Sequence, residues 1–129
     1  MDTHLLEELK KSIKGDVLTD DQTLKTYSHD ASLFEVTPQV LVFPKDTEDV
    51  KNLVKFVKDN KKNNPSLSLT ARSAGTDMSG GSINDSIIVC FEKYFNKIYG
   101  IRNDIATVEP GTYYRDFEKL TLSHGLIFP

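Results

Sequence analysis

Length, composition and charge narrow the classes of protein to which this chain can belong. Its 129 residues suffice for about one domain, and its 38% apolar and 27% charged residues are ordinary for a soluble protein. A net charge of −3 argues against a nucleic-acid partner, because such surfaces carry a basic excess. The one dense basic run, residues 55–62, has the spacing of a solvated helix face.

Two further features concern the compartment. No apolar stretch approaches the ~20 residues that a membrane-spanning helix needs. The N-terminus lacks the basic start and apolar centre of a signal peptide, so a cytoplasmic protein without a membrane span is expected. Cys90 is the only cysteine and lies in an apolar run, which favours a buried thiol over a nucleophile. No cysteines and histidines have metal-ligand spacing.

The first elements are predicted from apolar spacing and from helix and strand breakers. Leucines at helical spacing predict an amphipathic helix over residues 3–14, which Gly15 ends. The polar stretch 19–30 could hold one helical turn. Residues 39–43 are mostly aliphatic or aromatic and lie between two prolines, which predicts a short strand buried on both faces.

A strand–helix–strand unit is predicted to follow. Asp46 or Thr47 can cap a helix that Asn63-Asn64-Pro65 ends. Residues 67–71 and 86–91 are expected to form two more strands. Because such units cross over right-handedly, the first two strands are expected to be parallel neighbours. The helix should pack through an apolar stripe of Val50, Leu53, Val54 and Val57.

The pattern changes after residue 94. Residues 97–101 and 105–108 alternate in polarity about the turn Arg102-Asn103-Asp104, which predicts a hairpin. Thr112 is expected to cap a helix that Gly125 ends. The inner face of this helix should hold Tyr113, Phe117 and Leu120.

Three parts are therefore expected along the chain. Residues 1–20 carry the N-terminal helix, residues 21–94 form a first subdomain, and residues 95–129 begin a second one. The chain ends on the apolar run 126–129, which leaves large side chains without a following element to cover them. We accordingly expect a truncated chain.

Residues 70–82 are the most informative stretch, because they join small and hydroxyl-bearing residues between two apolar segments. Small side chains let a ligand approach the backbone, and successive N–H groups can converge on an anion. The hydroxyls of Ser73, Thr76 and Ser79 could act as extra donors. This chemistry suits a phosphate or diphosphate, although a flexible surface loop favours the same residue types.

Four stretches occur in an order and spacing that resemble a known family. They are residues 27–32 with 38–44, residues 47–50, residues 72–81, and residues 98–111 with 125–129. Together they resemble the FAD-binding domain of the vanillyl-alcohol oxidase/p-cresol methylhydroxylase superfamily, in its glycolate oxidase subunit and D-lactate dehydrogenase branch. The resemblance implies an α+β fold, the PCMH-type FAD-binding domain, with FAD in the crevice between the two subdomains.

The resemblance also implies a function for the whole protein. It would be an FAD-dependent dehydrogenase that oxidises a small 2-hydroxy acid such as D-lactate or glycolate, with an acceptor protein or a quinone as electron acceptor. None of the 129 residues is expected to be catalytic, and the isolated chain should bind FAD weakly or not at all. Two alternatives stay open: a non-catalytic remnant or interaction module with the same fold, and a phosphate-binding protein unrelated to flavins.

The residues expected to bind the cofactor follow from the same resemblance. They are Arg72, Ser73, Ala74, Gly75, Thr76, Asp77, Met78, Ser79, Gly80 and Gly111. Arg72 would either neutralise diphosphate charge or pair with an acid, and Asp77 should point outward or cap a turn.

The loop departs from the family pattern in one respect. Where the family usually reads Arg-Gly-Gly-Gly-Thr, this chain has Ser73 and Ala74 in the first two glycine positions. If Ala74 had to adopt a positive φ, its Cβ would cost about 1 kcal/mol or more. The loop holds no histidine to tether a flavin, so non-covalent FAD is expected.

Overall fold

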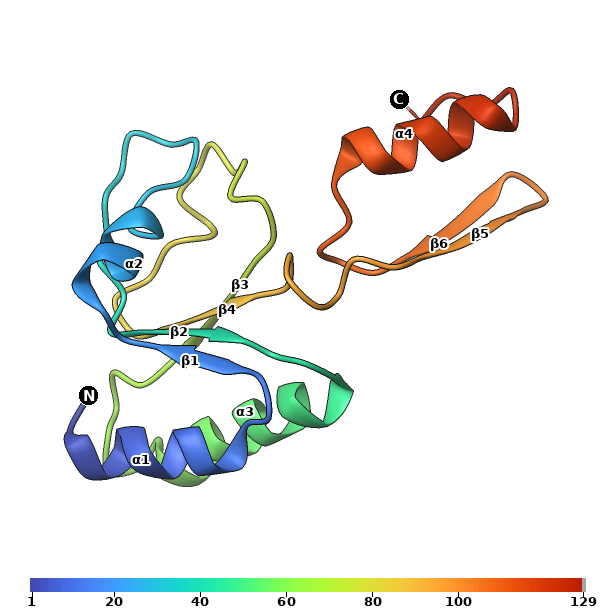
Figure 1. Ribbon diagram of the computed structural model, residues 1–129. Coiled ribbons are helices and arrows are strands. Elements are labelled where there is room, and N and C mark those ends of the chain that lie inside the picture. Colours follow the sequence, from blue (N-terminus) through green and yellow to red (C-terminus); the bar gives the residue numbers. More distant parts are fainter. Residues whose placement is uncertain (129) are drawn as a thin grey trace.

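A computed structural model describes residues 1–128, and its first part is built on a mixed four-stranded sheet (Figure 1). The strand order is β1-β2-β4-β3, with β1 antiparallel to β2 and the other neighbours parallel. The strands are β1 (Asp16–Leu18), β2 (Val40–Phe43), β3 (Leu69–Arg72) and β4 (Ile87–Cys90). The predicted α+β fold is confirmed.

The prediction that the first two strands of the strand–helix–strand unit are neighbours in the sheet is wrong. The strands β2 and β3 are parallel, but β4 lies between them and pairs with both. The reason is burial: β4 is apolar and buried along its whole length, whereas β3 carries a threonine and is buried only at Arg72. A strand without polar positions takes the centre of a sheet covered on both faces. Strand β1 was not predicted, because three residues give no recognisable alternation.

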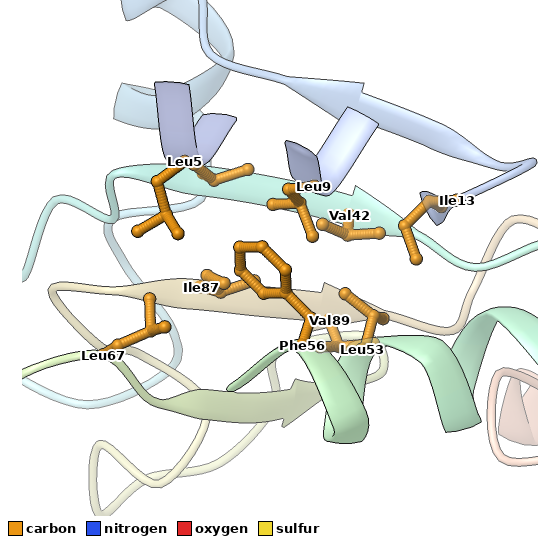
Figure 2. Packing of buried hydrophobic residues seen from close by; sticks show 10 residues of the cluster. Leu5, Leu9, Ile13, Val42, Leu53, Phe56, Leu67, Ile87 and Val89 are labelled. Carbon is orange, nitrogen blue, oxygen red and sulfur yellow. The ribbon is translucent and has the colours of Figure 1, made fainter. Parts of the chain in front are cut away.

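Two helices cover one face of the sheet (Figure 1). They are α1 (Thr3–Ser12) and α3 (Thr47–Asn60). Figure 2 shows Leu5, Leu9 and Ile13 pointing toward the side chains of the central strands, with α3 completing the core. Residues 1–20 thus contribute a helix and a strand to the core of the first part. The short helix α2 (Asp21–Thr26) adds Leu24 to a second apolar cluster, which includes Cys90.

The inner face of α3 differs from the predicted stripe. Its buried residues are Asp49, Leu53 and Phe56, and Val54 is 56% exposed. Asp49 lies inside because its carboxylate accepts three backbone N–H groups at 2.9 Å, those of Lys14, Gly15 and Lys45. Such a satisfied carboxylate can occupy a core position that a hydrophobicity pattern assigns to an apolar residue. The predicted cap Asp46 is confirmed, since it accepts the Asp49 N–H at 3.0 Å.

The second part is a hairpin followed by a helix. The hairpin strands β5 (Ile98–Arg102) and β6 (Ile105–Val108) are antiparallel, as predicted. Asn103 and Asp104 both have positive φ, 49° and 63°, as a type I′ turn requires. The helix α4 (Tyr114–Ser123) ends in a Schellman motif, in which Gly125 has φ 69° and the Leu126 N–H donates to the Thr121 carbonyl at 2.9 Å.

Two predictions for α4 are corrected. The capping position is Tyr113 and not Thr112, and no side-chain hydrogen bond caps the helix. Thr112 does not cap the helix because its hydroxyl donates to the Lys97 carbonyl at 3.4 Å. Tyr113 is exposed, so it does not belong to the inner face, on which Thr121 is the buried residue of the helix. Pro129, the end of the predicted apolar run, lies outside the described residues.

Within residues 1–128, no helix combines the length and apolar character needed to cross a bilayer. No group of three or more His, Cys, Asp or Glu side chains in this range is arranged to hold a metal ion.

Candidate functional site

A cleft of about 730 Å³ lies between the loop after β3 and the beginning of α4. Figure 1 shows the hairpin and α4 set apart from the sheet and joined to it by the segment that follows β4. One side of the cleft, here called the loop wall, consists of residues 73–77 with Ser82. The other side, the helix wall, consists of residues 112–116 with Lys119. The predicted crevice between the two parts therefore contains the glycine- and serine-rich loop.

The loop wall is shaped by Gly75. Its φ is 67°, which L-residues rarely adopt, and a Cβ added there would come within 2.3 Å of Nη2 of Arg72. Among residues 1–128, the non-glycine residues with positive φ are Asn103 and Asp104 alone. Ala74 therefore avoids the strain considered for it, and the departure from the family pattern leaves the backbone conformation intact.

The backbone donors of the loop wall are available to a ligand. Within the described chain, the N–H groups of residues 73–76 donate to no other group, and neither do the hydroxyls of Ser73 and Thr76. Backbone polar groups in folded proteins are normally paired with protein or with water. A run of adjacent amides left to solvent at a cleft is the arrangement that binds anions.

Asp77 and Ser79 satisfy one another. The Ser79 N–H and hydroxyl donate to Oδ1 of Asp77 at 2.6 and 2.7 Å. The Ser79 hydroxyl, followed by backbone N–H groups, lowers the pKa of the Asp77 carboxyl. Asp77 thus caps the turn, one of the two roles expected for it. Ser79 lies outside the cleft lining with its hydroxyl donating to Asp77, and its role as a phosphate donor stays a prediction.

Three more predicted residues lie outside the cleft. Met78 is 82% exposed. Gly80 has φ 84° and a Cβ there would meet the Phe34 ring at 3.0 Å, so it serves the shape of the loop. Gly111 packs on its own chain, because a Cβ there would lie 2.2 Å from the Phe91 carbonyl oxygen. Its close approach is to residues 91–95, and not to the cleft.

Arg72 lies beneath the loop and does not line the cleft. Its guanidinium sits 5.1 Å from the centroid of the Tyr27 ring, and Nη1 donates to the Tyr27 carbonyl at 3.3 Å. The residue is 9% exposed, and Nε is buried without a hydrogen-bond partner in the described part. No acid within residues 1–128 forms an ion pair with it. Pairing with an acid, one of the two expected roles, is therefore wrong.

The helix wall was missed at the sequence level. The first turn of α4 has no side-chain cap, and its leading residues Tyr114 and Arg115 line the cleft, so the positive end of the helix dipole lies at this wall. Arg115 adds a full positive charge, whereas Lys119 is paired with Asp116 at 2.9 Å. The Pro-Gly turn before the helix was a usable signal for a helix start, but nothing local shows that this turn faces residues 73–77.

The donors on the two walls fit a diphosphate. Unpaired amides, small side chains and an arginine supply hydrogen bonds and positive charge, and the groove has room for a ligand longer than a phosphate. Asp77 and Asp116 are the acids at its rim, and each is already engaged, with Ser79 and Lys119 respectively.

Comparisons with known proteins identify the family of this chain. A family model described as FAD binding domain matches residues 38–129. The D-2-hydroxyglutarate dehydrogenase of Haemophilus influenzae is 28% identical over 126 residues, covering 95% of this chain and 12% of that protein. The D-lactate dehydrogenase of Anaerostipes hadrus is 28% identical over 131 residues, covering 97% of this chain and 26% of that protein.

A solved structure supports the fold. That of p-cresol methylhydroxylase with substrate bound superposes with a TM-score of 0.74 at 20% identity, covering 95% of this chain and 25% of that chain. The chain belongs to the FAD-binding domain family, in the superfamily branch that its motifs predicted, and FAD is its cofactor. It spans 12% and 26% of the length of the two dehydrogenases.

Proposed function

We propose that the amides of residues 73–76 hold the diphosphate of a non-covalently bound FAD against the first turn of α4. The observation that carries this proposal is the unpaired run of N–H groups on the loop wall, opposite an uncapped helix start. The hydroxyls of Ser73 and Thr76 add donors, and Arg115 offsets part of the negative charge. The loop contains no histidine for a covalent tether.

We further propose that the whole protein is a dehydrogenase for a small 2-hydroxy acid. The support comes from the relatives, which are named for D-2-hydroxyglutarate and D-lactate. FAD supplies the hydride acceptor when bound, and this chain contributes binding and orientation. A protein or quinone electron acceptor and a cytoplasmic location remain parts of the proposal.

The experiment is an FAD titration of the purified chain, followed by absorption and flavin fluorescence. We expect saturable binding that is weak and is lost on desalting, because the cleft offers contacts to the diphosphate from only two short segments. A chain that ignores FAD and inorganic pyrophosphate alike would instead support the non-catalytic module. Binding of pyrophosphate without any preference for FAD would point to a phosphate-binding protein unrelated to flavins.

A further inference from the structure

A side-chain network, half-buried at Tyr27 and Glu92, connects the two walls of the cleft. Tyr27, at the C-terminal end of α2, is its centre, and it does not line the cleft. The Tyr27 hydroxyl donates to Oε1 of Glu92 at 2.6 Å, while its ring and carbonyl hold the Arg72 guanidinium. One side chain thus makes contacts in both directions.

Toward the loop wall, the network ends at Gly75. The Arg72 guanidinium packs so closely against this glycine that a Cβ would come within 2.3 Å of Nη2. Because Arg72 is held by Tyr27 and by no acid of the described chain, Tyr27 determines where the guanidinium lies. The position of the guanidinium in turn limits how far the backbone at Gly75 can sink toward the sheet.

Toward the helix wall, the network ends at Tyr113, which precedes the first turn of α4. Its hydroxyl lies 3.5 Å from Oε2 of Glu92, a longer and weaker contact than that of Tyr27. The Glu92 charge, followed by burial, raises the pKa of Tyr113. Burial, followed by the Glu92 hydrogen bond, raises the pKa of Tyr27. Both phenols therefore stay protonated and able to donate well above neutral pH.

We propose that Tyr27 and Glu92 are positioning residues that fix the spacing between the loop wall and the helix wall, and thereby the fit of a dinucleotide. The proposal rests on the proposed function, since the walls are assumed to share one ligand. Neither residue touches the cleft, so both act through others: Tyr27 through Arg72 and Gly75, and Glu92 through Tyr113.

The test compares Tyr27→Phe and Glu92→Gln with a matched control. Tyr94→Phe deletes a hydroxyl that likewise donates to a carboxylate, Asp16 at 3.0 Å, but this pair is not part of the network between the two walls. For each variant, the dissociation constants of FAD and of inorganic pyrophosphate are measured by titration. Thermal unfolding of the FAD-free protein is measured alongside.

Tyr27→Phe deletes the hydrogen bond to the carboxylate, and Glu92→Gln removes the charge of its acceptor. We expect each to weaken FAD binding by up to about tenfold, the scale of a hydrogen bond to a charged group. Pyrophosphate binding should change less than about twofold, because the loop amides remain and a short ligand does not depend on the wall spacing. Tyr94→Phe should lower the thermal midpoint to a similar extent as Tyr27→Phe, with FAD affinity unchanged.

Three outcomes would overturn the inference. Unchanged FAD affinity in both variants would show that the network does not control the walls. An equal loss of FAD and pyrophosphate would show damage to the loop itself instead of a changed spacing. If the unmodified chain bound neither ligand, the proposed function would have failed first, which the wild-type titration reveals before any variant is made.

Discussion

The two parts of this molecule are held together in different ways, and the cleft lies where they meet. The sheet part has apolar residues buried on both faces of β2 and β4. The hairpin and α4 leave large apolar side chains exposed, among them Ile105, Leu122 and Ile127. The position of the loop wall is therefore fixed by a packed core. The position of the helix wall depends more on turn geometry and on individual side-chain contacts.

The largest expected effect comes from removing a core side chain from the sheet part. Leu41→Ala, at a fully buried position, should lower the free energy of unfolding by about 2–5 kcal/mol. Leu122→Ala makes the same deletion in α4 at a side chain that is 58% exposed, and should cost less than about 0.5 kcal/mol. Urea denaturation measures both, and equal losses would remove the contrast between the two parts.

A second large effect should come from the buried carboxylate of α3. Asp49→Ala leaves three backbone N–H groups without their acceptor and should cost about 2–4 kcal/mol. Asp59→Ala on the exposed face of the same helix serves as the control, with an expected cost within about 0.5 kcal/mol. A small cost at Asp49 would mean that water replaces the carboxylate.

A moderate effect is expected when a left-handed glycine is replaced in each part. Gly75→Ala and Gly125→Ala have nearly the same φ, 67° and 69°, so each should cost about 1 kcal/mol of backbone strain. At Gly125 nothing lies within 4 Å of the added Cβ, whereas at Gly75 it meets Arg72. FAD titration should show weaker binding for Gly75→Ala alone, and equal affinities would count against the loop as the diphosphate site.

The last effect is absent at neutral pH and concerns alkaline conditions. Burial, followed by the Glu92 charge, raises the pKa of the Cys90 thiol from 9.0 to about 12. Because the unfolded chain ionises first, the contribution of this thiol to stability is complete below pH 9.0 and is lost as pH rises toward about 12. Between these limits, the free energy of unfolding of Cys90→Ala should fall less steeply with pH than that of the unmodified chain, as denaturation at several pH values would measure. Tyr27, whose pKa is also raised, should keep part of this pH dependence in the variant. An unchanged slope would contradict the burial argument.

Local signals explain why some elements were predicted correctly. The prolines around β2, the Asp46 cap and the Asn103-Asp104 turn each act within a few residues, so their effect can be read without the rest of the chain. Burial of Asp49 could not be read in this way. Its partners Lys14 and Gly15 are distant in sequence, and a carboxylate at a core position looks like a surface residue until its donors are known.

The candidate site divides along the same line. The loop wall was predicted because the composition of one short segment, rich in small and hydroxyl-bearing residues, is itself typical of an anion site. Residues 73–77 do line the cleft. The position of Ser79 outside the cleft lining could not be predicted in this way, since its hydroxyl donates to Asp77 two residues away. The helix wall was missed because an uncapped helix start becomes part of this site only where another segment, here the loop wall, lies opposite it.

The sequence by itself determined that a flexible-backbone, donor-rich loop follows a strand, and its motifs placed the chain in the FAD-binding domain family. Only the tertiary structure decided that β4 separates β2 from β3 and that Arg72 lies beneath the loop. It also brought Tyr27 and Glu92 into contact between the two walls of the cleft. The physical reason is the range of the forces. Backbone preference and capping act over a few residues, whereas burial and paired charge depend on which distant segments the fold brings together.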